Sequence, residues 1–135
     1  MGAIGRAIIF AIGSVSLIGS AAAADLTGAE IKTLLSGNSI YLENTATSSG
    51  GAGQGVIYFA ADGSALFKTA KGVILHGTWA IKDNTQCVDW KEQPNNPCTR
   101  YDKQGDTITS FNVATGQPRG KILKIVDGNP EKIGP

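Results

Sequence analysis

The most constraining feature of this sequence is the alternation of apolar and polar residues that begins after Gly37 and continues almost to the C-terminus. A period of two is typical of strands, because successive side chains point to opposite faces. Asp62 with Gly63 has the preferred chemistry of a tight hairpin turn, and similar turn sequences separate the other stretches. The pattern predicts eight short strands, at residues 39–43, 55–60, 64–69, 73–82, 86–90, 98–102, 107–113 and 121–126.

These strands follow one another through short turns, with no helical segment between them, which predicts an antiparallel meander. Eight strands is also the number at which a sheet closes around just enough space for side chains or one small ligand. Closure removes the exposed edges that invite aggregation. We therefore predict a mainly β fold, an eight-stranded up-and-down barrel of lipocalin-like architecture. The alternative is an open, strongly curved sheet wrapped on a helix.

One helix is predicted, immediately before the strands. Thr27 and Glu30 have the spacing of a capping box, in which each side chain satisfies an otherwise unpaired N–H group. Apolar side chains from Ile31 to Leu35 fall on one face, and Gly37 ends the helix. A short helix with a single apolar stripe needs a partner, so we expect it to pack across the end of the barrel.

The first 24 residues have the layout of a secretory signal peptide. Arg6 provides the positive charge, residues 7–19 are apolar, and residues 20–24 are small, with an Ala-x-Ala pattern ahead of Asp25. An uncleaved membrane anchor is the alternative, but a spanning helix needs about 20 strongly apolar residues and this segment ends in alanines. We predict cleavage near Ala24, a single domain at residues 25–130, and a flexible tail at 131–135.

The charge balance argues against partners that are held by electrostatics. The whole chain carries a formal charge of +1, and removal of Arg6 with the signal peptide leaves a neutral domain. A neutral domain exerts no long-range attraction on nucleic acid or on anionic lipid. We expect no nucleic-acid partner and no stable membrane insertion after cleavage.

The two cysteines, Cys87 and Cys98, are most simply a disulfide in an exported chain. A metal site is the competing interpretation, but the chain has no C-x-x-C motif and only His76 could add a soft ligand. The expected compartment is therefore oxidising, either the bacterial periplasm or the exterior. We predict no metal and no cofactor.

No catalytic residue is predicted, and we expect that the protein is not an enzyme. His76 is the only histidine, and strand parity places it on the outer face with Thr78, away from Leu75 and Trp79. No nucleophile or carboxylate can be placed beside it from spacing alone. The glycine-rich residues 50–55 lead into a strand and not a helix, so a hairpin loop explains them better than a phosphate cradle. Such a loop could act as a lid over a barrel mouth.

Aromatic residues are the remaining candidates for binding a ligand or partner. These are Trp90, Tyr58 and Trp79, although burial in the core is the ordinary role of such side chains in a small domain. Trp90 is the strongest candidate, because the proline-containing loop between the cysteines could expose it.

Four short motifs carry a resemblance to a known family. They are the Gly77-Thr-Trp79 and Cys87-Val-Asp-Trp90 sequences, the opening at residues 26–31, and the turn from Phe59 to Gly63. With them the chain resembles a family of small exported bacterial proteins for which no activity is established. Gly-x-Trp also occurs in lipocalins, but on their first strand, so the likeness to lipocalins is one of architecture only.

Two functions are consistent with these features. The first is an exported, non-enzymatic barrel that binds a small apolar or amphipathic ligand. The alternative is a periplasmic protein-interaction or inhibitor module, which would contact an envelope protein through the disulfide loop.

Overall fold

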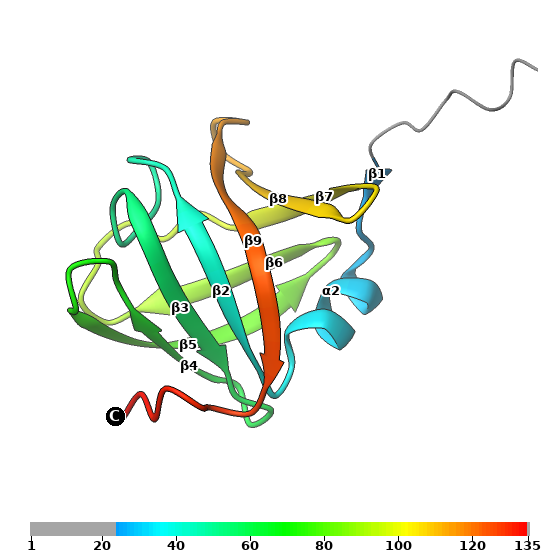
Figure 1. Cartoon of the computed structure of the whole chain (residues 1–135). Coiled ribbons are helices and arrows are strands. Elements are labelled where there is room, and N and C mark those ends of the chain that lie inside the picture. The colour runs from blue at the N-terminus through cyan, green and yellow to red at the C-terminus, as the bar shows by residue number, and fades with distance from the viewer. Residues whose placement is uncertain (1–23, 135) are drawn as a thin grey trace, which may run out of the picture.

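The computed structural model describes residues 24–134, so the predicted signal peptide lies outside the described residues except for Ala24. The chain forms a mainly β fold with one short helix (Figure 1). The elements are β1 (Ala24–Asp25), α2 (Gly28–Leu35), β2 (Asn38–Asn44), β3 (Gly53–Phe59), β4 (Ser64–Lys68), β5 (Ile74–Lys82), β6 (Thr85–Trp90), β7 (Thr99–Gln104), β8 (Thr107–Asn112) and β9 (Pro118–Asp127).

Strands β2 to β9 close into an eight-stranded antiparallel barrel, which confirms the predicted fold. Each strand pairs with its neighbour in sequence, and β9 returns to pair with β2 along almost its whole length. The alternative of an open sheet is therefore wrong. A bulge between Tyr41 and Leu42 interrupts the β2–β9 register and leaves Leu123 exposed.

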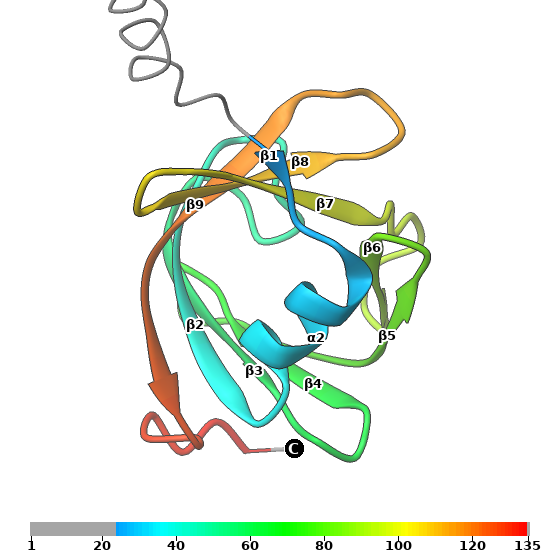
Figure 2. The ribbon, with the colours of Figure 1, turned by 90° about the vertical axis from the view of Figure 1, so that its right-hand side faces the viewer.

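The helix α2 lies across one end of the barrel, as predicted, and Figure 2 shows it inside the ring of strands. The capping box is present: the Glu30 N–H donates to the Thr27 hydroxyl, and the Thr27 N–H donates to the Glu30 carboxylate. Ile31 and Leu35 are fully buried against the barrel. The Gly28 N–H also donates to the Asn84 side chain at 2.8 Å, which fixes the start of the helix to the β5–β6 turn.

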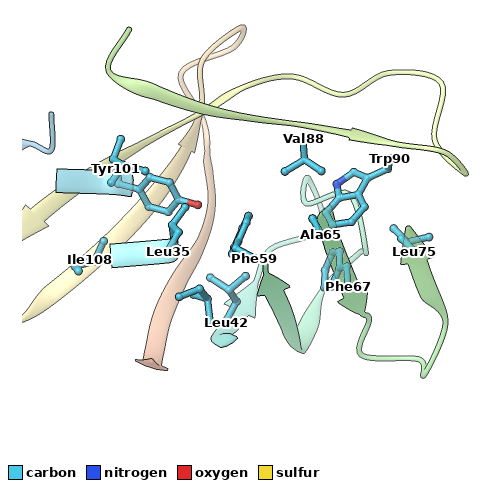
Figure 3. Close-up of a cluster of buried hydrophobic side chains, with 12 residues drawn as sticks. Leu35, Leu42, Phe59, Ala65, Phe67, Leu75, Val88, Trp90, Tyr101 and Ile108 are labelled. Atoms are coloured by element: carbon cyan, nitrogen blue, oxygen red, sulfur yellow. The ribbon is translucent and has the colours of Figure 1, made fainter. Parts of the chain in front are cut away.

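The core fills the barrel between this helix and its opposite end (Figure 3). Phe59 and Phe67 are 1% and 2% exposed, and Phe67 lies against Trp90 with 5.7 Å between ring centroids. Trp90 is opposite Gly77 on the neighbouring strand, and a Cβ atom at Gly77 would lie 2.9 Å from the indole ring. The glycine of the Gly-Thr-Trp motif thus makes room for the second tryptophan.

The seam between β6 and β7 is the weakest part of the barrel. Only one residue pair, Gln86 with Thr99, joins these two strands. The predicted disulfide between Cys87 and Cys98 is present and lies immediately beside that pair. Strand β1, which the sequence pattern did not predict, pairs with the remaining edge of β7, and Asp25 forms an ion pair with Arg100 at 2.8 Å.

The C-terminal segment contacts the barrel as far as Ile133, and the flexible tail predicted at residues 131–135 stays a prediction. Ile133 is 4% exposed, and the Asn129 side chain accepts from its N–H and donates to its carbonyl. Glu131 accepts a hydrogen bond from the Tyr41 hydroxyl at 2.8 Å. A single isoleucine in a polar tail gives no periodic signal, so the sequence pattern does not indicate this contact.

Candidate functional site at the open end of the barrel

The structure does not bring the three predicted aromatic residues together. Trp90 is inside the barrel and only 5% exposed, so the loop between the cysteines does not expose it. Trp79 is partly buried, packs edge-on against Phe59, and donates its indole N–H to the Ala60 carbonyl at 2.9 Å. Tyr58 is paired with Ser39 and Leu66 on the opposite face of its strand from Phe59. Of the three, Trp90 alone borders the internal cavity described next.

A small cavity lies inside the barrel at the end away from α2. Its volume is about 40 Å³, which is close to the space that one water molecule occupies in the liquid. Apolar side chains of the core form its floor, and polar side chains and two loops form the rest. The polar lining residues are Asn44, Ser48, Ser49, Gln86, Asn96, Thr99, Tyr101, Ser110 and Arg119.

Arg119, near the start of β9, is the one charged residue in this lining. Its guanidinium donates to the Ser49 hydroxyl at 2.7 Å, the Thr99 hydroxyl at 3.0 Å and the Pro97 carbonyl at 3.2 Å. All three acceptors are neutral. Burial lowers the pKa of Arg119 below its ordinary value, because the charged form loses hydration there.

Two buried amide side chains lie in the same lining. The Tyr101 hydroxyl donates to Gln86 Oε1 at 2.6 Å, and burial raises the pKa of that tyrosine above its ordinary range. The Gln86 amide nitrogen and the Asn44 side chain form no hydrogen bond within residues 24–134, although these residues are only 5% and 9% exposed. These amide atoms are not fully cut off from solvent, because the fully buried side-chain atoms without a partner in residues 24–134 are Asn96 Oδ1 and Asp102 Oδ1. The cavity lining therefore has spare hydrogen-bonding groups within reach of a ligand.

Two loops cover the cavity, and both lie at the end of the barrel away from α2 in Figure 1. The β2–β3 loop contains residues 50–52 of the glycine-rich segment that was expected as a lid, while residues 53–55 belong to β3. Gly50 approaches Phe67 so closely that a Cβ atom would lie 2.7 Å from the ring. The β6–β7 loop contacts the β2–β3 loop through Gln93, whose amide donates to the Ser49 carbonyl at 3.3 Å. Asn96 folds the second loop with a bond to the Gln93 carbonyl, while its own Oδ1 is buried without a donor among the described residues.

His76 lies on the barrel exterior, partly exposed, as its strand parity predicts. Sequence spacing could not place a carboxylate beside it, but the structure does: Glu92 accepts from the His76 backbone N–H at 2.8 Å and lies 2.7 Å from Nδ1. Within residues 24–134 no hydroxyl or thiol hydrogen-bonds to this ring. The pair therefore fastens the β6–β7 loop to β5.

We expect the His76–Glu92 contact to stabilise the protein only above strongly acidic pH. Hydrogen bonds from the His76 backbone and ring lower the pKa of Glu92 below its ordinary value of 4.5. A lowered pKa in the folded state gives stability that is present above pH 4.5 and is lost as the pH falls through the folded value. A ¹³C NMR titration of the Glu92 carboxyl should have a midpoint below 4.5. A midpoint at or above 4.5 would show that the contact does not form in solution.

Two further features of the described residues concern the class of site. Across the described part of the chain, no helix combines the length and the apolar character needed to cross a membrane. Residues 24–134 also contain no group of three or more histidine, cysteine or acidic side chains placed to hold a metal ion.

The fold and the site define a closed antiparallel barrel that has a helix across one end and a small polar cavity under two loops at the other. Comparison of the chain with protein-family models, with curated proteins and with solved structures finds no match.

The sequence pattern does not single out Arg119, Gln86 or Asn44 as site residues. Strand parity contains a signal for Gln86, which shares the inner face of β6 with Val88 and Trp90. A glutamine in that row is a polar residue at a core position. Arg119 gave no such signal, because it was expected in the turn that precedes the last strand.

Proposed function

We propose that this protein is an exported, non-enzymatic binding protein that holds a small amphipathic ligand at the open end of its barrel. The observation that carries the proposal is the buried polar cavity, in which Gln86 and Asn44 have unused hydrogen-bonding groups. These amide groups are within reach of a ligand, and Asn96 Oδ1 in the same lining is fully buried without a donor among residues 24–134, which is costly unless a partner completes it. A ligand head group is a partner of the right kind.

The packed core limits how such a ligand would bind. Pockets that enclose a whole drug-sized molecule measure about 300–1,000 Å³, whereas this cavity is about 40 Å³. The cavity therefore has room for a head group only. The apolar part of the ligand would extend outward between the two loops. A purely apolar ligand deep in the barrel is less compatible with this geometry than an amphipathic one at the mouth.

Export is part of the same proposal. The N-terminal signal layout supports it, and the Cys87–Cys98 disulfide is compatible with an oxidising compartment. The resemblance to small exported bacterial proteins belongs to the same proposal.

Native mass spectrometry tests the proposal directly. The full chain is expressed in a bacterium with its own N-terminus, and protein from the periplasm is compared before and after denaturation. We expect a mature chain that begins at Asp25 and carries an adduct, which disappears on denaturation and is absent after refolding in clean buffer. Protein that carries no adduct, and binds nothing when a solvent extract of cells is added back, would contradict the binding function.

A protein-interaction or inhibitor role is the second candidate, because the β6–β7 loop is exposed yet held in one shape. Pro94 and Asn95 are exposed at its tip, while the disulfide, Asn96 and the His76–Glu92 contact fix its base. Trp90 is buried, so the tip of the loop and not the tryptophan would meet the partner. In a crosslinking experiment on envelope extract, Asn95→Arg should remove a specific partner that Asp106→Arg, on the distant β7–β8 turn, retains.

A further inference from the structure

We infer that the group bound at the barrel mouth is a carboxylate, which Arg119 receives, on a ligand that also carries a hydrogen-bond donor close to that carboxylate. This inference rests on the proposed function and identifies the chemical class of its ligand.

The first support is the absence of a negative partner for Arg119. Residues 24–134 contain two ion pairs, which join His76 to Glu92 and Arg100 to Asp25, and neither involves Arg119. Arg119 is half-buried, and charged side chains that lose contact with water are ordinarily paired with an opposite charge. An arginine fork also matches a carboxylate geometrically, because two parallel N–H groups can meet its two oxygens.

The second support is the chemistry of the surrounding groups. The unpartnered amides of Gln86 and Asn44 offer additional donors to an anion, and no acidic side chain lines the cavity to repel it. Asn96 Oδ1 instead needs a donor from the ligand, since it is a buried acceptor without a hydrogen-bond partner among residues 24–134. A carboxylate with a hydroxyl or amino group on the adjacent carbon presents both kinds of partner in one head group.

The third support is the way in which the covering loop is held. The Ser49 hydroxyl accepts from the Arg119 guanidinium at 2.7 Å, so the β2–β3 loop is fastened to the group that would receive the carboxylate. A carboxylate competes for the same N–H group, because hydrogen bonds between two charged groups are stronger than those to a neutral hydroxyl. Ligand binding would therefore release Ser49 and let the loop move outward to admit the rest of the ligand.

The test compares three probes of equal chain length: hexanoate, 2-hydroxyhexanoate and the neutral hexanamide. Isothermal titration calorimetry on the mature protein, refolded to remove any bound adduct, should show that hexanoate binds at least tenfold more tightly than hexanamide. The hydroxy acid should bind more tightly than hexanoate. Equal binding of hexanoate and hexanamide would overturn the carboxylate assignment.

Substitutions at Arg119 distinguish carboxylate binding by this residue from a purely structural role. Arg119→Gln should lower the affinity for hexanoate to that for hexanamide. Arg119→Lys should keep only part of the difference in affinity, because lysine has the charge of arginine but not its two parallel N–H donors. The matched control is Arg100→Gln, since Arg100 is an arginine on β7 that already pairs with Asp25. It should bind all three probes as the unaltered protein does. Retention of the hexanoate preference in Arg119→Gln would refute the proposal.

Two measurements keep the result interpretable. If Arg119→Gln does not fold, the ¹⁵N–¹H signal of the Arg119 side chain in the unaltered protein should still shift on addition of hexanoate and not of hexanamide. If no probe binds but periplasmic protein carries a natural adduct, the carboxylate assignment fails while the binding function stands. If neither adduct nor probe binding is found, both fail.

Discussion

Replacing Trp90 by alanine is expected to lower the free energy of unfolding by about 3–5 kcal/mol, the usual cost of removing a large buried aromatic side chain. The indole is 5% exposed and packs against Phe67 in the space that Gly77 leaves open. Its removal forfeits these contacts and leaves a cavity that the surrounding strands cannot fill. Urea unfolding followed by far-UV circular dichroism measures the change.

Val113→Ala is the matched control for this experiment. Val113 is 46% exposed, and surface substitutions usually change stability by less than about 0.5 kcal/mol. If Trp90→Ala costs less than about 1 kcal/mol, an amount typical of partly exposed sites, the indole is not buried in solution. Trp90 would then be a candidate for an exposed binding residue, as the sequence suggests.

Removal of the disulfide should have the second largest effect. The bond joins residues separated by 11 positions, and opening a loop of that size restores unfolded-state entropy worth about 3 kcal/mol. The double substitution Cys87→Ala with Cys98→Ala is therefore expected to lower the free energy of unfolding by about 3 kcal/mol. Urea unfolding of the double variant, beside oxidised and reduced samples of the unaltered protein, measures the loss.

The position of the disulfide predicts where the reduced protein opens first. Strands β6 and β7 share only the pair Gln86 with Thr99, so without the sulfur bridge little else holds this seam closed. Hydrogen exchange should accelerate in β6 and β7 well before it does in β2 and β9, which pair along their whole length. Uniform acceleration across all strands would show that the bridge stabilises the protein without protecting this seam.

Much of the fold could be predicted because its signals are local. The alternation after Gly37 identified all eight barrel strands, and the capping box at Thr27 and Glu30 identified the helix. The two-residue strand β1 was missed, since two residues are too few to show a period. Strand β9 was predicted to begin at Lys121 but begins at Pro118, because Pro118 pairs with Phe111 and Gly120 with Ser110 on β8.

That last difference explains why the candidate site was missed. A Gly-Gln-Pro-Arg-Gly sequence predicts an exposed turn, where an arginine needs no partner. Barrel closure instead brings Arg119 between two strands and under two loops, where its contacts come from Ser49, Pro97 and Thr99. Those residues are between 20 and 70 positions away in the chain, so no local pattern could connect them to it.

The sequence by itself determined the strands, the helix and the disulfide, because strand alternation, helix capping and turn chemistry act between residues a few positions apart, and two cysteines in an exported chain leave one simple pairing. Only the tertiary structure decided that Trp90 belongs to the core and that one arginine, Gln86 and Asn44 meet in a single cavity. Which inward-facing side chains become neighbours depends on the register with which the last strand returns to the first. That register is set by closure of the whole sheet.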